Sequence, residues 1–247
     1  MKLPDLQHRT PDCARRFRLL ARIQRRYETA ETHVNLGGQR FPFVRVADPN
    51  VVLDRVAEED SQRQGKREPG APLHLPYWAE LWDSAIGMGA YVLSGAGPAL
   101  AGKAVLDLGC GMGLAGCVAA SAGANVVFAD LETDPLLFAR LNSLAWEDQV
   151  RTQRLDWRTH RLSQRFDVIL GADILYERSQ WDYLEPFWRD HLALGGQVLL
   201  GEPGRQTGEA FVPWISSRGW RLQTVIQPVS TRPVPIRLLT LTLQGGA

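Results

Sequence analysis

The chain has 247 residues, of which 45% are hydrophobic and 22% are charged, and its formal net charge is +1. This length favours one large domain with an extension, and the near-neutral charge argues against nucleic acid as a substrate. The three cysteines lack disulfide or metal-ligand spacing, and no secretory leader or membrane-spanning apolar run occurs, so we expect a cytoplasmic protein without membrane attachment and without a metal.

The first part of the chain, residues 1–75, is predicted to be an extension of the main domain, residues 76–247. Residues 15–27 have helical apolar spacing and an arginine-rich outer face, which is either a solvated surface or a binding patch. Residues 33–46 alternate apolar and polar side chains around two glycines, which predicts a β-hairpin. Residues 58–72 lack periodicity, and we expect a solvated linker there.

The main domain is predicted to alternate strands and helices. A helix over residues 78–93 precedes them, and Thr133 and Asp134 are candidate caps of a later helix. This alternation is typical of a mainly parallel sheet with helices on both faces. The predicted strands cover residues 103–108, 125–130, 151–156, 166–171 and 197–201, and the predicted helices cover residues 113–122, 135–146 and 180–192.

The chain ends differently, with two predicted strands over residues 220–226 and 237–243. The Pro-rich loop between them has no room for a crossover helix, so the two strands should pair antiparallel. The expected fold is therefore a doubly wound α/β domain with a seven-stranded, mostly parallel sheet and an antiparallel C-terminal hairpin. It resembles the Rossmann-like class I methyltransferase fold.

A glycine-rich loop joins the first strand of this sheet to its helix. Glycines at such a place let the backbone approach a ligand at the helix N-terminus. Residues 111–116 (GMGLAG) also satisfy the dinucleotide pattern G-x-G-x-x-G, and Asp130 stands where a ribose-binding acid should follow. A dinucleotide is therefore one candidate ligand.

Asp107, two residues before the first glycine of this loop, favours a different ligand. A carboxylate there would repel a diphosphate, whereas it would attract the ammonium and sulfonium groups of S-adenosylmethionine through water or backbone groups. Asp130 can accept hydrogen bonds from the ribose hydroxyls of either ligand. We therefore expect S-adenosylmethionine as the cofactor.

The cysteine and tryptophan side chains near the loop suggest more about packing and stacking than about covalent chemistry. Cys110 has no base beside it in the sequence, so we interpret it as a small side chain in a crowded turn. Trp157 follows the third strand, where adenine would lie if the ribose contacts Asp130, and Trp82 precedes the loop. Both are candidates for cofactor contact, since aromatic faces attract sulfonium groups and stack on adenine.

Four motifs give the chain a specific resemblance. The segments LWDSA (81–85), LDLGCGMG (106–113), LDW (155–157) and GADILY (171–176) resemble methyltransferase family 16, the seven-strand protein-lysine methyltransferases. The segments PYWA (76–79) and GEPGR (201–205) are similar to the branch of this family that acts on the β-subunit of electron transfer flavoprotein. Related enzymes that methylate amides and adenine carry the motif Asn/Asp-Pro-Pro-Tyr at this place. Residues 173–176 read DILY instead, which disfavours amide and adenine substrates.

The resemblance implies roles for particular residues. The acidic-x-x-aromatic motif falls on Asp173 and Tyr176, which would orient and deprotonate the incoming lysine, and Glu202 would line the same mouth. A protein substrate follows from this reading. The alternative role of Asp173 is that of a helix N-cap, and the alternative role of Glu202 is that of a loop acid that stabilises Arg205. The implied cofactor contacts are Trp82, Gly109, Cys110, Gly111, Asp130, Trp157 and Ala172.

Three other functions stay open at the sequence level. The same fold serves N-methylation of small amines and nicotinamide-type substrates, because a fold does not fix a function. The 111–116 pattern leaves an NAD-dependent oxidoreductase as a further alternative. The third alternative is a binding module without catalytic activity, whose basic helix would dock a partner.

Overall fold

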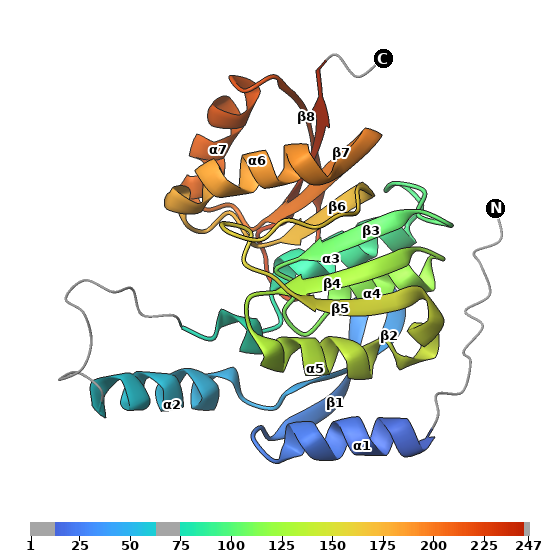
Figure 1. Ribbon diagram of the computed structural model, residues 1–247, viewed down its shortest axis with the longest axis vertical. Coiled ribbons are helices and arrows are strands. Elements are labelled where there is room, and N and C mark those ends of the chain that lie inside the picture. Colours follow the sequence, from blue (N-terminus) through green and yellow to red (C-terminus); the bar gives the residue numbers. More distant parts are fainter. Residues whose placement is uncertain (1–12, 63–74, 245–247) are drawn as a thin grey trace.

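A computed structural model describes residues 13–62 and 75–244. Its centre is a seven-stranded sheet with the order β5-β4-β3-β6-β7-β9-β8 (Figure 1). The first five strands in this order run parallel, whereas β9 is antiparallel to both of its neighbours, which confirms the predicted C-terminal pairing. The strands are β3 (Ala104–Leu108), β4 (Asn125–Asp130), β5 (Val150–Arg154), β6 (Phe166–Ala172), β7 (Leu192–Glu202), β8 (Trp220–Gln227) and β9 (Ile236–Leu243).

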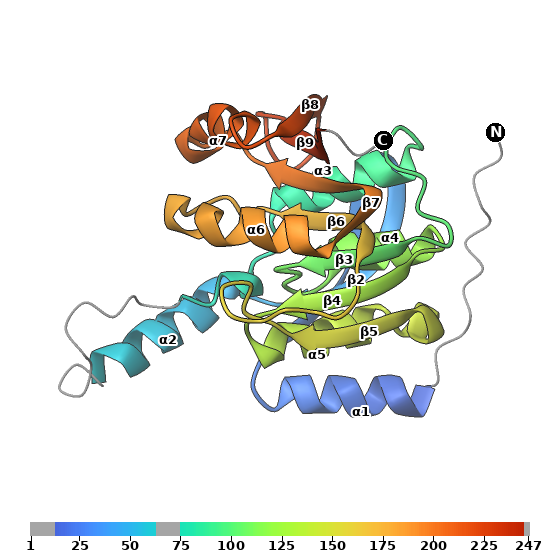
Figure 2. The ribbon, with the colours of Figure 1, turned by 45° about the horizontal axis from the view of Figure 1, so that its top comes forward.

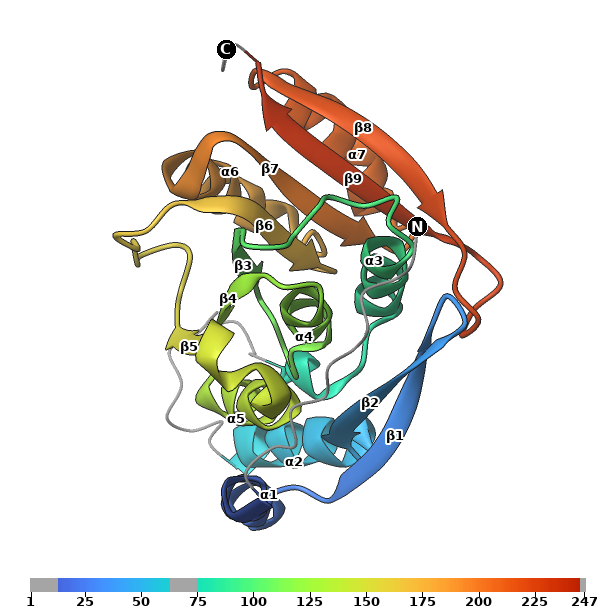
Figure 3. The same ribbon diagram turned by 90° about the vertical axis from the view of Figure 1, so that its right-hand side faces the viewer.

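Helices cover both faces of this sheet, and adjacent strand residues point to opposite faces. On β3, Val105 joins the apolar cluster on the side of α3, α4 and α5, while Leu106 joins the cluster on the side of α6 and α7. Figure 3 shows α3 and α4 on one side of the central strands and α6 on the other. The helices are α3 (Asp83–Leu93), α4 (Leu114–Ser121), α5 (Thr133–Asn142), α6 (Trp181–His191) and α7 (Gln206–Ser216).

The residues before the sheet form α1 (Cys13–Gln24), the hairpin β1 (Thr29–Leu36) and β2 (Gln39–Val46), and α2 (Pro49–Gln62). The predicted hairpin is confirmed, and its turn places Gly37 and Gly38 at φ values of 62° and 93°, which glycine adopts without steric cost. Helix α1 lies alongside α5, and α2 extends away from the sheet (Figure 2). Buried side chains of α1 and of the hairpin belong to the same apolar cluster as α3, α4 and α5.

The predicted linker was wrong at its start. Residues 58–62 belong to α2, and residues 63–74 lie outside the described residues. The sequence does contain the start signal of this helix: Pro49 occupies its first position, and Oδ1 of Asp48 accepts a hydrogen bond from the backbone N–H of Asn50 at 2.9 Å.

The predicted helix over residues 78–93 is divided. A 3-10 turn, η1 (Tyr77–Ala79), is followed by extended backbone at Glu80 and Trp82, and α3 begins only at Asp83. The break separates two tryptophans with different surroundings. Trp78 is buried against rings of the extension and α5, whereas Nε1 of Trp82 donates to the carbonyl of Tyr77 at 2.9 Å.

Other predicted boundaries also differ. Helix α5 begins at Thr133 without a side-chain cap, and the carboxylate of Asp134, predicted to cap it, bonds to Arg26 and Tyr27 instead. The helix ends at Asn142, and 3-10 turns η2 (Leu144–Gln149) and η3 (Arg178–Gln180) follow later in the chain. Helix α7 was not predicted, because Gly208 and Pro213 interrupt its pattern.

Within residues 13–62 and 75–244, no helix has the length and apolar character needed to cross a membrane. No group of three or more His, Cys, Asp or Glu side chains in the same ranges has the arrangement of a metal site.

Candidate functional site

The turn between β3 and α4 forms one wall of the candidate site. Gly109, Gly111 and Gly113 have φ values of 66°, 52° and 88°, a region that other residues rarely adopt. A Cβ added at Gly109 would lie 2.9 Å from Cγ2 of Ile174. The backbone N–H of Cys110 donates to the carbonyl of Ala129 on β4 at 3.0 Å, which fixes the turn against the neighbouring strand. The sequence therefore needs glycine here for both conformation and space.

Two carboxylates stand beside this turn. Asp107 on β3 is 1% exposed, and its Oδ2 accepts a hydrogen bond from the backbone N–H of Gly116 at 2.8 Å. Asp130 ends β4 and accepts from the backbone N–H groups of Gly111 at 2.9 Å and Glu132 at 3.1 Å. Burial raises the pKa of Asp107 to about 7 and the pKa of Asp130 to about 6. Both carboxylates are thus held by backbone groups of the turn and its helix.

Neither of these two carboxylates forms an ion pair with a described Lys, Arg or His side chain. A buried carboxylate without a cation is costly, and a ligand with positive charge and hydroxyl donors would relieve that cost. A diphosphate would add to it. The glycine turn and the donor and acceptor types around it therefore suit S-adenosylmethionine better than a dinucleotide.

Trp157, which follows β5, lies beside the glycine turn. Its Cζ3 atom is 3.6 Å from the position of a Cβ at Gly109, and its Nε1 donates to Oε1 of Gln180 at 3.1 Å. Cys110 lies within the turn and is half-buried, and burial raises the pKa of its thiol, so it remains a neutral packing group.

Ala172, Asp173 and Tyr176 stand at the end of β6, next to β3. Among the described residues Asp173 is the one non-glycine residue with a positive φ, 60°, and its backbone N–H donates to the carbonyl of Gly201 on β7 at 2.9 Å. Among the described residues no helix begins between Asp173 and Arg178, so Asp173 is not a helix cap. Backbone strain of this kind gathers at functional sites because the surrounding structure must hold it.

The carboxylate of Asp173 is buried and forms a two-pronged ion pair with the guanidinium of Arg205, in which Nη2 lies 3.2 Å from Oδ2. Burial raises the pKa of Asp173, while Arg205 opposes that shift. The guanidinium carbon of Arg205 also lies 5.6 Å from the ring centre of Trp82. Arg205 therefore joins the β6 end of the site to the start of α3.

Two exposed tyrosines, Tyr77 and Tyr176, contact each other near the end of β6. Tyr176 is 38% exposed and Tyr77 is 42% exposed, and their ring centres are 5.7 Å apart. Burial of part of Tyr176 raises the pKa of its hydroxyl to about 12, so it stays protonated at neutral pH. The ring of Trp82 lies 6.3 Å from that of Tyr77. The three rings form an aromatic rim, defined here as Tyr77, Trp82 and Tyr176.

Glu202 occupies a different position from the one expected at the mouth. It is 2% exposed, and its Oε1 accepts from the backbone N–H groups of Gly204 at 2.9 Å and Arg205 at 2.5 Å. Its Oε2 pairs with the guanidinium of Arg237 at 2.5 Å. With both oxygens engaged, Glu202 holds the turn that carries Arg205, rather than facing solvent.

The structure adds two residues that sequence reasoning did not assign. Arg205 and Tyr77 complete the surroundings of Asp173 and Tyr176. Both lie in motifs that carried the resemblance, residues 201–205 and 76–79, but the spacing along the chain gave no sign that these two segments meet beside Asp173.

The comparisons with known proteins match this part of the chain. Residues 78–215 fit the family described as lysine methyltransferase. The electron transfer flavoprotein beta subunit lysine methyltransferase of Danio rerio is 33% identical over 144 residues, which cover 54% of this chain and 52% of that protein. The protein N-lysine methyltransferase METTL21A of Xenopus tropicalis is 35% identical over 136 residues, covering 49% of this chain and 58% of that protein. The matched region spans about half the length of these relatives.

Solved structures share the architecture. The glycopeptide N-methyltransferase MtfA complexed with S-adenosylmethionine has a TM-score of 0.55 at 15% identity, covering 64% of this chain and 87% of that chain. A TehB-like methyltransferase from Corynebacterium glutamicum has a TM-score of 0.52 at 17% identity, covering 80% of this chain and 100% of that chain. At these identities the likeness concerns the fold, and it confirms the predicted class I, Rossmann-like α/β architecture.

Proposed function

The chain belongs to the lysine methyltransferase family, and on that premise we propose that it transfers a methyl group from S-adenosylmethionine to the side-chain nitrogen of a protein lysine. The observation that carries the proposal is Asp173, a buried carboxylate on strained backbone. Its neighbour Ile174 packs against the glycine turn, and its partner Arg205 lies over Trp82 of the aromatic rim. The named activities of relatives that align over about half their length support the same reaction.

We assign the cofactor to the carboxyl ends of β3, β4 and β6. Asp130 would accept hydrogen bonds from the ribose, Trp157 would cover the adenine, and Asp107 would act through the backbone of Gly116 and the turn. When bound, S-adenosylmethionine supplies a methyl group that its sulfonium makes electrophilic. The remaining implied contacts are Trp82, Gly109, Cys110, Gly111 and Ala172.

The chain's own contribution is to prepare the lysine. A lysine nitrogen attacks only when neutral, and with a reference pKa near 10.4 only about one in a thousand is neutral at pH 7.4. Asp173 would bind the incoming ammonium and receive or relay its proton, while the hydroxyl of Tyr176 would orient the nitrogen. Alignment of the nitrogen with the methyl carbon would provide much of the rate acceleration.

The open rim favours a protein side chain over a small amine. Tyr77 and Tyr176 are both more than a third exposed, so the aromatic rim is open to a lysine on a protein surface. A small-molecule N-methyltransferase, by comparison, encloses most of its substrate.

The test is mass spectrometry of a bacterial-type lysate incubated with purified enzyme and isotopically labelled cofactor. We expect labelled methyl groups on lysines of a protein. Asp173→Asn should lower the rate by about a hundredfold or more, within the usual range for removal of a general base. Asp182→Asn is the matched control, since it makes the same chemical change on an exposed side chain of α6 that pairs with Arg218. Label on small amines alone, or equal rates for the two variants, would overturn the proposal.

A further inference from the structure

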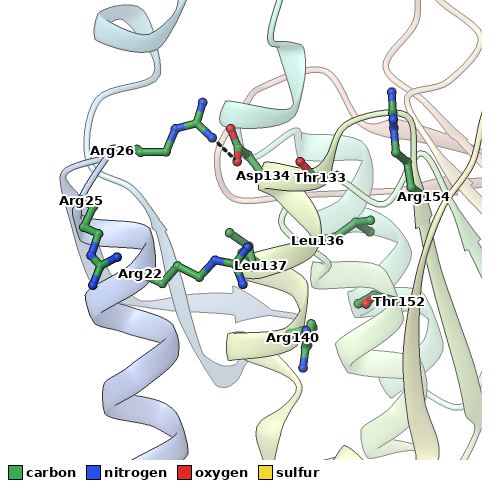
Figure 4. Close-up of a pocket in the computed structure, with 10 residues that line it drawn as sticks. All are labelled: Arg22, Arg25, Arg26, Thr133, Asp134, Leu136, Leu137, Arg140, Thr152 and Arg154. Atoms are coloured by element: carbon green, nitrogen blue, oxygen red, sulfur yellow. Dashed lines mark hydrogen bonds and ion pairs between the residues drawn. The ribbon is translucent and has the colours of Figure 1, made fainter.

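A second concave site lies outside the proposed transfer site, between the C-terminal part of α1, helix α5 and the edge strand β5. It encloses about 550 Å³ (Figure 4). Five arginines line it: Arg22 of α1, Arg25 and Arg26 in the turn that follows α1, Arg140 of α5 and Arg154 of β5. We call this cavity the arginine pocket.

The arginine pocket has a large excess of positive charge. Its one acidic lining residue, Asp134, already pairs with Arg26 at 2.7 Å and accepts a hydrogen bond from Tyr27. No carboxylate within the described ranges forms an ion pair with Arg22, Arg25, Arg140 or Arg154. Arg154 donates to the carbonyl of Leu131 at 2.9 Å, and its charge remains uncompensated. Four cations thus surround one cavity without an acidic counterpart.

Other arginines of α1 have different surroundings. Arg15 pairs with Glu147, and Arg16 pairs with Glu31 at 2.8 Å. Arg18 is exposed and lies outside the pocket. Arg22 near the end of α1 and Arg25 just after it line the cavity together with arginines of α5 and β5.

We propose that the arginine pocket docks an acidic segment of the protein substrate, an inference that rests on the proposed lysine methylation. Carboxylates of Asp and Glu side chains match guanidinium groups in charge and in planar geometry. Complementary charges across an interface mainly set which partner binds and how fast. The pocket would thus select the protein whose lysine is presented to Asp173.

The walls of the arginine pocket favour a peptide over nucleic acid. None of its lining residues is aromatic, whereas proteins that hold single strands stack bases on aromatic rings. Leu136 and Leu137 of α5 instead offer apolar contacts to aliphatic parts of a peptide. Strand β5 forms one end of the sheet, and among the described strands it pairs only with β4. Its free edge can accept an extended peptide by backbone hydrogen bonds.

The arginine pocket lies at the same edge of the sheet as the proposed transfer site. Thr133 and Asp134 line it and follow Asp130 by three and four residues, and Arg154 pairs in register with Asp130. Both Asp130 and Arg154 are at the carboxyl ends of parallel strands, the edge that also carries Asp173. A substrate anchored in the arginine pocket can therefore present a nearby lysine to the rim on the same edge.

The direct test is binding of a fluorescent peptide, in which one lysine is followed by a run of glutamates, measured by anisotropy at low ionic strength. We expect the triple variant Arg22→Gln, Arg25→Gln, Arg140→Gln to bind about tenfold more weakly, from the summed loss of three exposed ion pairs. The matched control is Arg18→Gln, Arg40→Gln, Arg221→Gln, which removes the same charge from exposed arginines outside the pocket and should bind as the unaltered protein does. Arg26 and Arg154 are left intact because they hold Asp134 and Leu131.

The outcomes separate docking from catalysis. The same peptide with glutamines in place of glutamates should bind weakly to all three proteins, and it should be methylated with a higher KM and a similar kcat. Binding that depends on the pocket arginines without methylation of any peptide would refute the proposed reaction and leave the docking site. Equal affinity of the triple variant and its control would overturn the docking proposal. So would tighter, pocket-dependent binding of a single-stranded oligonucleotide of equal charge.

Discussion

The two ends of the candidate site use opposite ways of holding a carboxylate. At the ends of β3 and β4, Asp107 and Asp130 accept hydrogen bonds from backbone N–H groups and have no described cationic side chain as a partner. At the ends of β6 and β7, Asp173 and Glu202 are each paired with an arginine. The first end is a fixed frame with uncompensated negative charge, and the second is a set of closed ion pairs.

This difference follows from what each end has to bind. A cofactor that carries its own positive charge can complete the β3–β4 end without moving a side chain, so rigidity is an advantage there. Under the proposed function, a lysine that arrives as an ammonium would share Asp173 with Arg205, and the ion pair at the β6–β7 end would open during the reaction. Experiments that change only one end should therefore give different kinds of effects.

The largest effect is expected from filling the turn. Gly113→Ala places a Cβ 2.8 Å from Cβ of Ala139 and 3.1 Å from the ring of Phe128, at a φ of 88°. Backbone strain and overpacking together should lower the free energy of unfolding by about 3 kcal/mol. Urea unfolding measures this loss, and calorimetry should find no binding of S-adenosylhomocysteine, since the turn can no longer close around a ligand.

Gly95→Ala separates strain from packing. Gly95 has a φ of 75° and no atom within 4 Å of an added Cβ, so this variant should lose only about 1 kcal/mol and bind the cofactor normally. Equal losses in the two variants would mean that the crowding at Gly113 has no role in shaping the turn.

A smaller effect is expected from removing the uncompensated charge at the β3–β4 end. Asp107→Asn should weaken S-adenosylmethionine binding about thirtyfold near pH 8, the loss of one charge-assisted interaction. The ligand-free variant should nonetheless unfold at a higher temperature than the unaltered protein at that pH, because it no longer buries a charge. Weaker binding together with lower thermal stability would indicate a purely structural role for Asp107.

The pH dependence has a definite sign. Burial raises the pKa of Asp107 to about 7, above that of the unfolded chain, so the stabilisation from its protonated form is complete near pH 4 and is lost as the pH rises through about 7. A cationic ligand prefers the ionised carboxylate, so affinity should increase with pH through about 7 and binding below it should release a proton. In Asp107→Asn only the smaller slope near pH 6, from Asp130, should remain. Calorimetry in buffers of different ionisation enthalpy measures the proton release.

The β3–β4 end is also the end that the sequence predicts better. Its residues lie within one strand-turn-helix unit and the following strand, so glycine spacing and the acids Asp107 and Asp130 define it locally. The prediction of β4 over residues 125–130 matches the structure, because strongly apolar central strands have one stable environment. The local sequence alone is therefore enough to predict the residues at the β3–β4 end of the site.

The β6–β7 end depends on contacts that spacing does not encode. Asp173 and Arg205 are 32 residues apart, and Tyr77 meets Tyr176 across 99 positions, so their partnerships follow from the order of strands in the sheet. The break before α3 and the presence of α7 were missed for a similar reason: tertiary packing of Trp78 and Phe211 outweighs the local pattern. Glu202 does not face the mouth as expected, because Arg237 on β9 forms an ion pair with its carboxylate. The sequence pattern gives no sign of this contact.

The smallest of these effects is expected from the partner of Asp173 at the β6–β7 end. Arg205→Gln removes the cation that lowers the pKa of Asp173, so burial should raise this pKa further. Because only the ionised carboxylate can bind an ammonium, the acidic limb of the kcat/KM profile should move to higher pH. We expect about a tenfold loss near pH 6.5 and little difference near pH 9.

Arg205→Lys provides the comparison for this variant, since it keeps the charge and loses the two-pronged geometry. Its acidic limb should lie between those of the unaltered enzyme and Arg205→Gln, whereas a variant that merely damaged the fold would lose activity equally at every pH. The opposite result, a higher kcat/KM for Arg205→Gln across the profile, would mean that the guanidinium competes with the lysine for Asp173 instead of keeping it ionised. In that case the ion pair between Asp173 and Arg205 inhibits the reaction. The β6–β7 end would then hold its own cation in place of the substrate, whereas the β3–β4 end has no described cationic side chain.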